Sequence, residues 1–137
     1  MAHQQSFVVS TPGRGFTEVT AEVARVVEAA EVDTGLATVF VHHTSASLLI
    51  CENADPQVMR DLAAWLERAV PDGDPLYHHT AEGPDDMPAH VRSVLTGCSV
   101  SVPVVDGRAA LGTWQGVYLA EHRRAPHRRR VTVTVTG

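Results

Sequence analysis

Histidines and carboxylates are concentrated in one stretch of the chain, YHHTAEGPDDMPAH at residues 77–90. Its six ionisable residues other than the tyrosine are His78, His79, Glu82, Asp85, Asp86 and His90. Neutral imidazole is the commonest metal-binding side chain at neutral pH, and a carboxylate can act as a general base. The stretch is therefore either one wall of a metal or acid–base site or a solvated polar loop.

The number of imidazoles decides which metal to expect. Three histidines and an open position are typical of a catalytic zinc site, whereas fewer nitrogens with carboxylates and water favour magnesium or manganese. No HExxH motif is present, and His79 and His90 are eleven residues apart, so they meet only if the loop 80–89 folds back. A glycine and two prolines in this stretch favour such a turn. Glu82 and Asp85 are expected to be solvated loop charges, and His78 is expected to face away from the site if the segment is extended. Alternatively, Asp85 and Asp86 cap the helix that follows and complement its dipole.

A second polar segment, HHTS at 42–45, lies where the chain is otherwise apolar and rich in β-branched residues. This composition predicts a strand at 36–43 and a second, shorter strand near 46–51. Neighbouring residues on a strand point to opposite faces of the sheet. Only one of His42 and His43 is therefore expected to face a given site.

Helical periodicity predicts three helices, one of them with a clear start. In the segment 52–75, Asp55 is a good N-cap, a proline follows it, and apolar residues including Trp65 recur along one face. We expect Trp65 to lie in the core. The other helices are predicted within 16–32 and over 88–97.

The remaining segments alternate as strands, with glycines and an Asp-Gly pair at the turns. These strands are predicted at 6–10, 98–108, 109–122 and 130–137. In total, about six strands and three helices predict an α+β fold with a mainly antiparallel, sandwich-like sheet, formed as a single domain over residues 1–137.

Composition excludes several classes of protein. A formal charge of −5 argues against a general nucleic-acid binder, and no apolar run is long enough for a transmembrane helix. No signal peptide is recognisable, so a cytoplasmic protein is expected, with Cys51 and Cys98 as reduced core thiols. All basic side chains are arginine, and the run HRRAPHRRR (122–130) is either an exposed turn or a phosphate-binding segment.

Four motifs in order along the chain resemble those of one known family. They are HHTSASLLICENADPQVMRDL, YHHTAEGPDDMPAHV, PVVDGRAALGTWQGVYLAEH and RRRVTV. Together they resemble the YjbQ-like family of uncharacterised proteins, which is often described as secondary thiamine-phosphate synthase. The resemblance runs from about residue 36 to the C-terminus, and ENADP, DDMPAH and GTWQG are specific in combination.

The resemblance implies a compact α+β subunit with a sandwich-like sheet, assembled as a homotrimer around histidine-lined pockets. It places the metal ligands at His43, His79 and His90, with zinc as the expected metal and magnesium as the alternative. Asp55 matches another family position and is a candidate for contact with the metal-binding residues or with the substrate. The candidate catalytic residues are Asp86, Glu121 and Asn53. The candidate substrate-binding residues are Thr44, Ser45, Gln115, Arg128 and Arg130.

The activity implied by the family joins a pyrimidine pyrophosphate to a thiazole phosphate and expels pyrophosphate. That chemistry needs a cation for the leaving group, donors for phosphate oxygens and a surface for the rings, which Trp114 could supply unless it lies in the core. Two alternatives stay open. One is a metal-dependent hydrolase with Asp86 or Glu121 as general base. The other is a non-enzymatic trimeric module that binds a metal or a small anion.

Overall fold

The computed structural model describes residues 2–137, which form eight strands and three helices. In chain order they are β1 (Ala2–Thr11), β2 (Gly15–Glu18), α1 (Thr20–Ala29), β3 (Gly35–Val41), β4 (Ala46–Glu52), α2 (Pro56–Ala69), α3 (Asp86–Thr96), β5 (Ser99–Val105), β6 (Arg108–Ala109), β7 (Gln115–Glu121) and β8 (His127–Thr136). The predicted α+β fold with three helices is confirmed.

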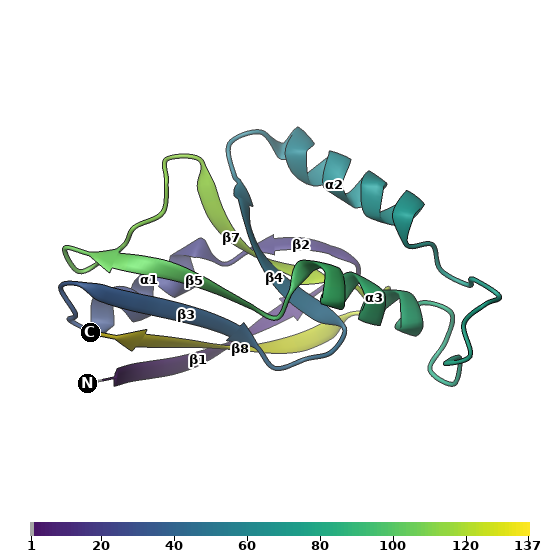
Figure 1. Cartoon of the computed structure of the whole chain (residues 1–137), viewed down its shortest axis with the longest axis horizontal. Coiled ribbons are helices and arrows are strands. Elements are labelled where there is room, and N and C mark those ends of the chain that lie inside the picture. The colour runs from purple at the N-terminus through teal and green to yellow at the C-terminus, as the bar shows by residue number, and fades with distance from the viewer. Residues whose placement is uncertain (1) are drawn as a thin grey trace.

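The strands form two antiparallel sheets, which Figure 1 shows curling around one another. The larger sheet has the order β1-β8-β3-β5-β6, and the smaller has the order β2-β7-β4. Residues 130–137 alternate valine and threonine because β8 lies in the larger sheet with one face toward the core. Val131, Val133 and Val135 are fully buried there. They join valines of α1 and apolar residues of the smaller sheet in one core.

The first helix begins later than its periodicity predicts. Residues 16–18 pair with β7 as an edge strand, and the helix begins at Thr20. The Val19 amide donates to the Val117 carbonyl at 2.7 Å, which holds this junction against the smaller sheet. Pairing with a distant strand thus outweighs the helical pattern of the segment's first turn.

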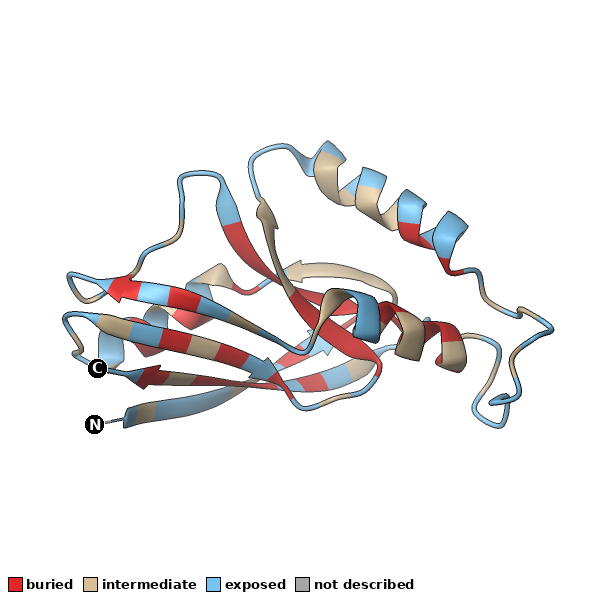
Figure 2. Cartoon of the chain, viewed as in Figure 1, coloured by how far each residue is buried: buried red, intermediate tan, exposed pale blue. Residues whose placement is uncertain are grey.

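The second helix confirms its predicted start and corrects the predicted position of Trp65. Asp55 caps α2 by accepting the Gln57 amide at 2.9 Å, and Pro56 is the first helical residue. However, α2 lies outside both sheets (Figure 1), and Leu66 is the one buried residue along it (Figure 2). Trp65 is 52% exposed, so the prediction that it lies in the core was wrong.

The structure corrects one predicted strand and one predicted buried cysteine, and it decides the position that was left open for Trp114. The segment predicted as one strand at 109–122 is divided, because a loop at 110–114 separates the short β6 from β7. Trp114 ends that loop and is 63% exposed, which excludes a core position within this chain. Cys51 and Cys98 are both free thiols, but Cys98 is exposed rather than in the core.

Among the described residues, no helix combines the length and the apolar composition that a bilayer crossing requires.

Candidate metal centre and the cleft beside it

Three of the residues singled out in the sequence converge at the start of α3. Asp86 is the first residue of α3 and His90 lies one turn later, so the two share a helix face. The loop before α3 brings His79 back to them. The Asp86 Oδ2 lies 2.7 Å from His79 Nε2 and 3.1 Å from His90 Nε2. Ligand atoms of all three residues lie within 4.8 Å of one another.

The hydrogen bond on the far side of the His90 ring fixes how this ring can bind a cation. Its Nδ1 lies 3.0 Å from the Thr44 carbonyl oxygen, which can only accept, so Nδ1 carries the proton. In the neutral ring Nε2 then has a lone pair directed at the Asp86 carboxylate. Two electron-rich atoms at this distance require a proton or a cation between them. Metal-binding histidines are commonly oriented by such a carbonyl, so the three residues fit a divalent cation.

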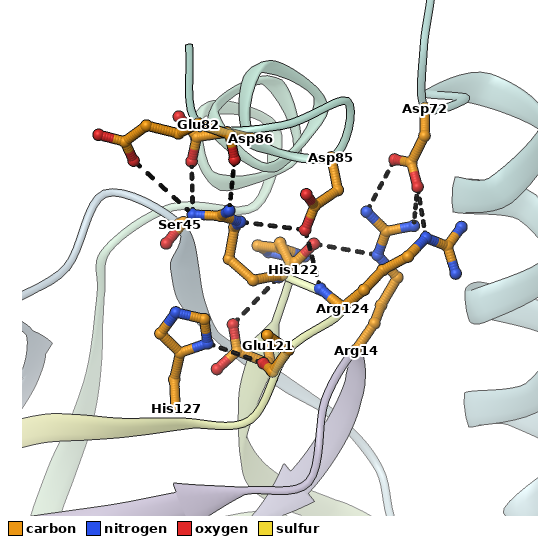
Figure 3. A network of polar contacts seen from close by, with 12 residues as sticks. Arg14, Ser45, Asp72, Glu82, Asp85, Asp86, Glu121, His122, Arg124 and His127 are labelled. Carbon is orange, nitrogen blue, oxygen red and sulfur yellow. Dashed lines mark hydrogen bonds and ion pairs between the residues drawn. The ribbon is translucent and has the colours of Figure 1, made fainter. Parts of the chain in front are cut away.

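Asp86 is an anionic partner in this group despite being buried. Burial alone raises the pKa of Asp86, but the His79 hydrogen bond and the positive charge of Arg123 outweigh burial and lower it. Arg123 Nη1 holds the second carboxylate oxygen at 2.9 Å. Asp85 was expected to be solvated, which was wrong: it accepts Arg123 Nε at 3.0 Å and the Arg124 amide at 2.9 Å (Figure 3). Neighbouring arginines thus fix the carboxylates at the start of α3.

A cleft of about 730 Å³ opens beside the three residues, and His90 belongs to both. Its volume lies within the range of sites for small molecules. The polar residues of its wall are His42, His43, Thr44, His90 and Ser93, and the apolar ones include Phe40, Val41 and Val94. A molecule bound in this cleft would lie beside the group formed by His79, Asp86 and His90, because His90 belongs to both.

The two neighbouring histidines of the HHTS segment both line the cleft. The expectation that only one could do so was wrong, because β3 ends at Val41 and the alternation of a strand does not extend to His42 and His43. His43 does not lie in the group formed by His79, Asp86 and His90. Its Nε2 accepts the Arg130 amide at 2.9 Å, so the lone pair that would bind a metal is already used.

Glu121, a predicted general base, is the centre of a buried ion pair instead. It is 1% exposed and is held by both Nε and Nη2 of Arg129, by the Thr11 hydroxyl at 2.6 Å and by the Arg123 amide at 3.1 Å. Burial raises the pKa of Glu121, but hydrogen bonds from Arg129 and Thr11 outweigh it and lower the pKa. A carboxylate held by these four donors stays ionised and stabilises the fold, and this arrangement does not suit a general base.

The same ion pair also engages Ser45, which was predicted to bind substrate. Arg129 Nη2 donates to the Ser45 hydroxyl at 2.9 Å, so Ser45 supports the buried arginine rather than a substrate. Arg128 and Arg130, predicted to bind phosphate, are exposed on β8, while Arg129 between them is buried. Sequence alternation contains the signal for this arrangement, because residue 129 shares its face with valines 131, 133 and 135.

Asn53 and Gln115 lie at the other end of the smaller sheet. β4 and β7 are paired antiparallel from Ala46 opposite Glu121 to Glu52 opposite Gln115, a span of roughly 20 Å. Asn53 donates to Glu18 at 3.1 Å, and Gln115 accepts the Gly112 amide at 2.8 Å. Within one chain, these two predicted site residues are therefore remote from His79 and His90.

His122, next to the ion pair, will make the protein less stable as the pH falls. It is 2% exposed, its Nε2 lies 2.8 Å from the Ser47 hydroxyl, and burial together with the Arg92 charge lowers its pKa to about 4. The unfolded chain, with a His122 pKa near 6.5, therefore binds the additional proton between pH 6.5 and 4. We expect this residue alone to cost up to about 3 kcal/mol across that window.

Urea denaturation at pH 7, 6 and 5 measures this loss. His122→Gln, which keeps a hydrogen-bonding side chain but cannot take up the proton, is expected to flatten the pH dependence over this range. Equal slopes for the variant and the unchanged protein would show that His122 is not the source of the loss.

A family model described as "UPF0047 protein YjbQ-like" matches residues 5–137. Among curated relatives, UPF0047 protein sll1880 of Synechocystis sp. is 52% identical over 98% of this chain and 92% of the relative. UPF0047 protein YjbQ of Escherichia coli O157:H7 is 41% identical over 100% of this chain and 99% of the relative.

Solved structures agree with this assignment. The conserved hypothetical protein TT1486 from Thermus thermophilus has a TM-score of 0.83 and 37% identity, covering 94% of this chain and 97% of the other. A YbjQ-like protein of unknown function from Sulfolobus solfataricus P2 has a TM-score of 0.92 at 22% identity, covering 100% and 98% of the two chains, and so supports the fold alone. The predicted fold and the resemblance are confirmed, and the chain belongs to the UPF0047 family of YjbQ-like proteins.

Proposed function

We propose that this protein is a metal-dependent enzyme that acts on a small phosphorylated molecule bound in the cleft beside His90. The metal would be a divalent cation, zinc by its donor set, held by His79, Asp86 and His90. The observation that carries the proposal is the His90 ring, whose Nδ1 is bound to the Thr44 carbonyl while its Nε2 faces the Asp86 carboxylate at 3.1 Å.

Two histidines, one carboxylate and an open position are a donor set found in catalytic zinc sites. A bound cation would supply Lewis-acid polarisation and would neutralise charge on a leaving group. The chain itself orients His90 through Thr44 and keeps Asp86 ionised through Arg123. His43, which faces the cleft and not the metal group, would contact the bound molecule. These roles replace the three-histidine ligand set expected from the family resemblance.

Thiamine-phosphate formation is the first reaction to test, because the family resemblance suggests it and the cleft suits its components. In that reaction a bond forms between the pyrimidine methylene carbon and the thiazole nitrogen, and pyrophosphate leaves. Phe40 and Val41 offer apolar surface for the rings, and the leaving pyrophosphate would depart toward the metal. Thr44 is the predicted substrate contact that also lines the cleft.

The assay incubates the purified protein with both substrates and separates the product by liquid chromatography. We expect product from the metal-loaded protein and at least about 100-fold less from the metal-stripped protein and from His90→Ala, since the proposed cation supplies several kcal/mol of transition-state stabilisation. His78→Ala, one residue from His79 and outside the metal group, is the matched control. No product above the metal-stripped control would contradict the synthase proposal, and equal product from the metal-loaded and metal-stripped proteins would contradict its dependence on metal.

A hydrolase is the second candidate, favoured by the same two-histidine, one-carboxylate donor set, which is that of hydrolytic zinc enzymes. Asp86 would then be a ligand, not the general base. Screening the metal-loaded protein against phosphoesters and amides, with His90→Ala as the inactive control, separates hydrolysis from synthesis. The absence of any turnover, combined with retained metal, would favour the third candidate, a non-enzymatic binding module.

We further propose that the protein is a homotrimer whose contacts use the exposed apolar residues of α2, α3 and the segment between them. Trp65 is 52% exposed, Leu76 81%, Val94 84% and Leu95 61%. Large exposed apolar patches are typical of interaction surfaces. Val94 also lines the cleft, so the assembly would border it. A second copy of the chain is the occupant that the family resemblance favours.

Leu95→Asp should disrupt this assembly. A buried, unpaired carboxylate in an interface is costly, so the variant is expected to run with the mass of one 14.7 kDa chain, whereas the unchanged protein has three times that mass. Light scattering coupled to size exclusion gives the masses. Arg25→Asp, at an exposed position on α1, is the control that should leave the trimer intact. An unchanged protein that is already monomeric would exclude the assembly.

A further inference from the structure

A second, smaller cavity lies between α2, α3 and the junction of β2 with β7. Its volume is about 180 Å³, large enough for more than one water molecule. Three arginines from different parts of the chain line it: Arg14, Arg92 and Arg124. None of the proposed metal ligands or cleft residues belongs to its wall. The chemistry of this cavity is therefore not explained by the proposed function.

Arg92 is the least exposed of these arginines and lacks the partners that a buried guanidinium normally has. Its side chain is 2% exposed. Nη2 donates to the Val70 carbonyl at 2.9 Å and to the Leu66 carbonyl at 3.4 Å, but Nε has no hydrogen-bond partner within residues 2–137. The nearest carboxylate, that of Glu67, lies 3.8 Å from Nη2. Leaving a buried charged donor unpaired is costly, so the Arg92 guanidinium on the cavity wall carries a positive charge that the described residues satisfy only in part.

The other two arginines are held around the same space by two carboxylates. Glu67 accepts Nη1 of Arg14 at 3.2 Å and Nη2 of Arg124 at 3.5 Å. Asp72 accepts both Nη1 and Nη2 of Arg14, at 3.1 and 2.9 Å, and Nε of Arg124 at 2.5 Å (Figure 3). Arg14 Nε also donates to the His122 carbonyl at 3.0 Å. Asp72 thus fixes both guanidinium groups before a ligand binds, so binding would not have to order these two side chains.

The charges around the cavity do not cancel. Three guanidinium groups face two carboxylates, those of Glu67 and Asp72, because the Glu121 carboxylate on the wall is already paired with Arg129. Glu67 is 46% exposed and so lies partly in solvent, where its charge is screened. His122, also on the wall, adds no negative charge. Arg124 is 57% exposed and is screened in the same way as Glu67. The least exposed charges are therefore the guanidinium groups of Arg14 and Arg92 against the one carboxylate of Asp72, an excess of one positive charge.

We propose that this cavity is a binding site for a small oxyanion of the phosphate type, either the free ion or the terminal phosphoryl group of a small molecule. The planar donor fork of arginine matches the oxygens of phosphate. The small volume excludes a nucleotide, whose sites are several times larger. The anion would contact the guanidinium groups of Arg14, Arg92 and Arg124 and would balance the excess charge. This site is separate from the metal centre and does not depend on the proposed activity.

Thermal unfolding during a titration with inorganic phosphate, at constant ionic strength with chloride, tests the proposal. The unchanged protein is expected to show a saturable rise in Tm, because a ligand that binds the folded state stabilises it. Arg92→Met, which keeps the apolar volume, is expected to weaken the apparent affinity at least tenfold. Arg68→Met, at an exposed position on α2 outside the cavity wall, is the matched control and should respond like the unchanged protein.

Two further variants keep the test decisive. Arg124→Met, at a position that is 57% exposed, removes a second donor without opening the core, and it should also weaken phosphate binding if Arg92→Met fails to fold. His90→Ala should leave the phosphate response unchanged. A response lost in His90→Ala and kept in Arg92→Met or Arg124→Met would place the anion at the metal centre and overturn the proposal, as would a Tm that does not respond to phosphate at all.

A parallel titration with glycerol phosphate distinguishes the two sources of the anion. A similar affinity for both compounds would identify a site for a terminal phosphoryl group. A response to inorganic phosphate alone would identify a site for the free ion. Both outcomes support an oxyanion site, provided that Arg92→Met or Arg124→Met weakens the binding.

Discussion

Glu121→Leu will lower the free energy of unfolding by about 3–5 kcal/mol, the usual cost of removing one partner from a buried ion pair. The leucine removes the carboxylate that binds Arg129 through Nε and Nη2, and Arg129 is 3% exposed. The guanidinium would keep only its contacts to Ser45 and His43. Urea denaturation at pH 7 measures the loss.

The double variant Glu121→Leu/Arg129→Met is the matched control for this prediction. Replacing both partners with apolar residues is expected to recover much of the stability, because no uncompensated charge remains buried. The same ion pair predicts an acid effect. Because the folded-state pKa of Glu121 lies below its usual 4.5, its contribution is complete above pH 4.5 and is lost as the pH falls through the lowered value. A single variant as stable as the unchanged protein would show that Glu121 is not the structural anion described here.

Asp86→Ala will weaken divalent metal binding by about 100-fold or more, because removing even a residue that only supports the ligands typically costs 10–100-fold in metal affinity. Asp86 presents one oxygen to both His79 Nε2 and His90 Nε2. The alanine removes the anionic donor and leaves two neutral imidazoles. Calorimetric titration with zinc measures the affinity.

Glu82→Ala is the matched control, since Glu82 is a carboxylate of the same loop that is 66% exposed and outside the metal group. It should bind zinc as the unchanged protein does. Circular dichroism should show that Asp86→Ala is folded, because Arg123 keeps its bond to Asp85 at 3.0 Å. Unaltered zinc affinity in folded Asp86→Ala would remove Asp86 from the ligand set.

Local signals in the sequence predicted several parts of this molecule correctly. Asp55 followed by proline predicted the start of α2, because the side chain and the ring act on the first helical turn alone. The alternating valines predicted β8 and its buried face. Asp86 was predicted as a catalytic residue and His90 as a metal ligand, and those roles stay predictions; their spacing of four on a helix explains why the two side chains meet. These features depend on neighbours within a few residues of one another.

Other features depend on contacts between distant segments, which local patterns do not contain. The antiparallel pairing of β4 and β7 places Asn53 and Gln115 at the end opposite Ser45. The end of β3 at Val41 lets His42 and His43 share one cleft. Amphipathicity identified the apolar face of α2, but it could not tell that the rest of the chain leaves Trp65 exposed.

The proposed metal centre is tested most directly by measuring the metal content of untagged protein by mass spectrometry, together with His79→Ala, His90→Ala and His43→Ala. We predict about one zinc per chain in the unchanged protein, loss of that zinc in His79→Ala and His90→Ala, and its retention in His43→Ala, whose Nε2 is bound to the Arg130 amide. A protein that contains no metal, or one that loses it only with His43, would contradict the metal centre proposed at His79, Asp86 and His90.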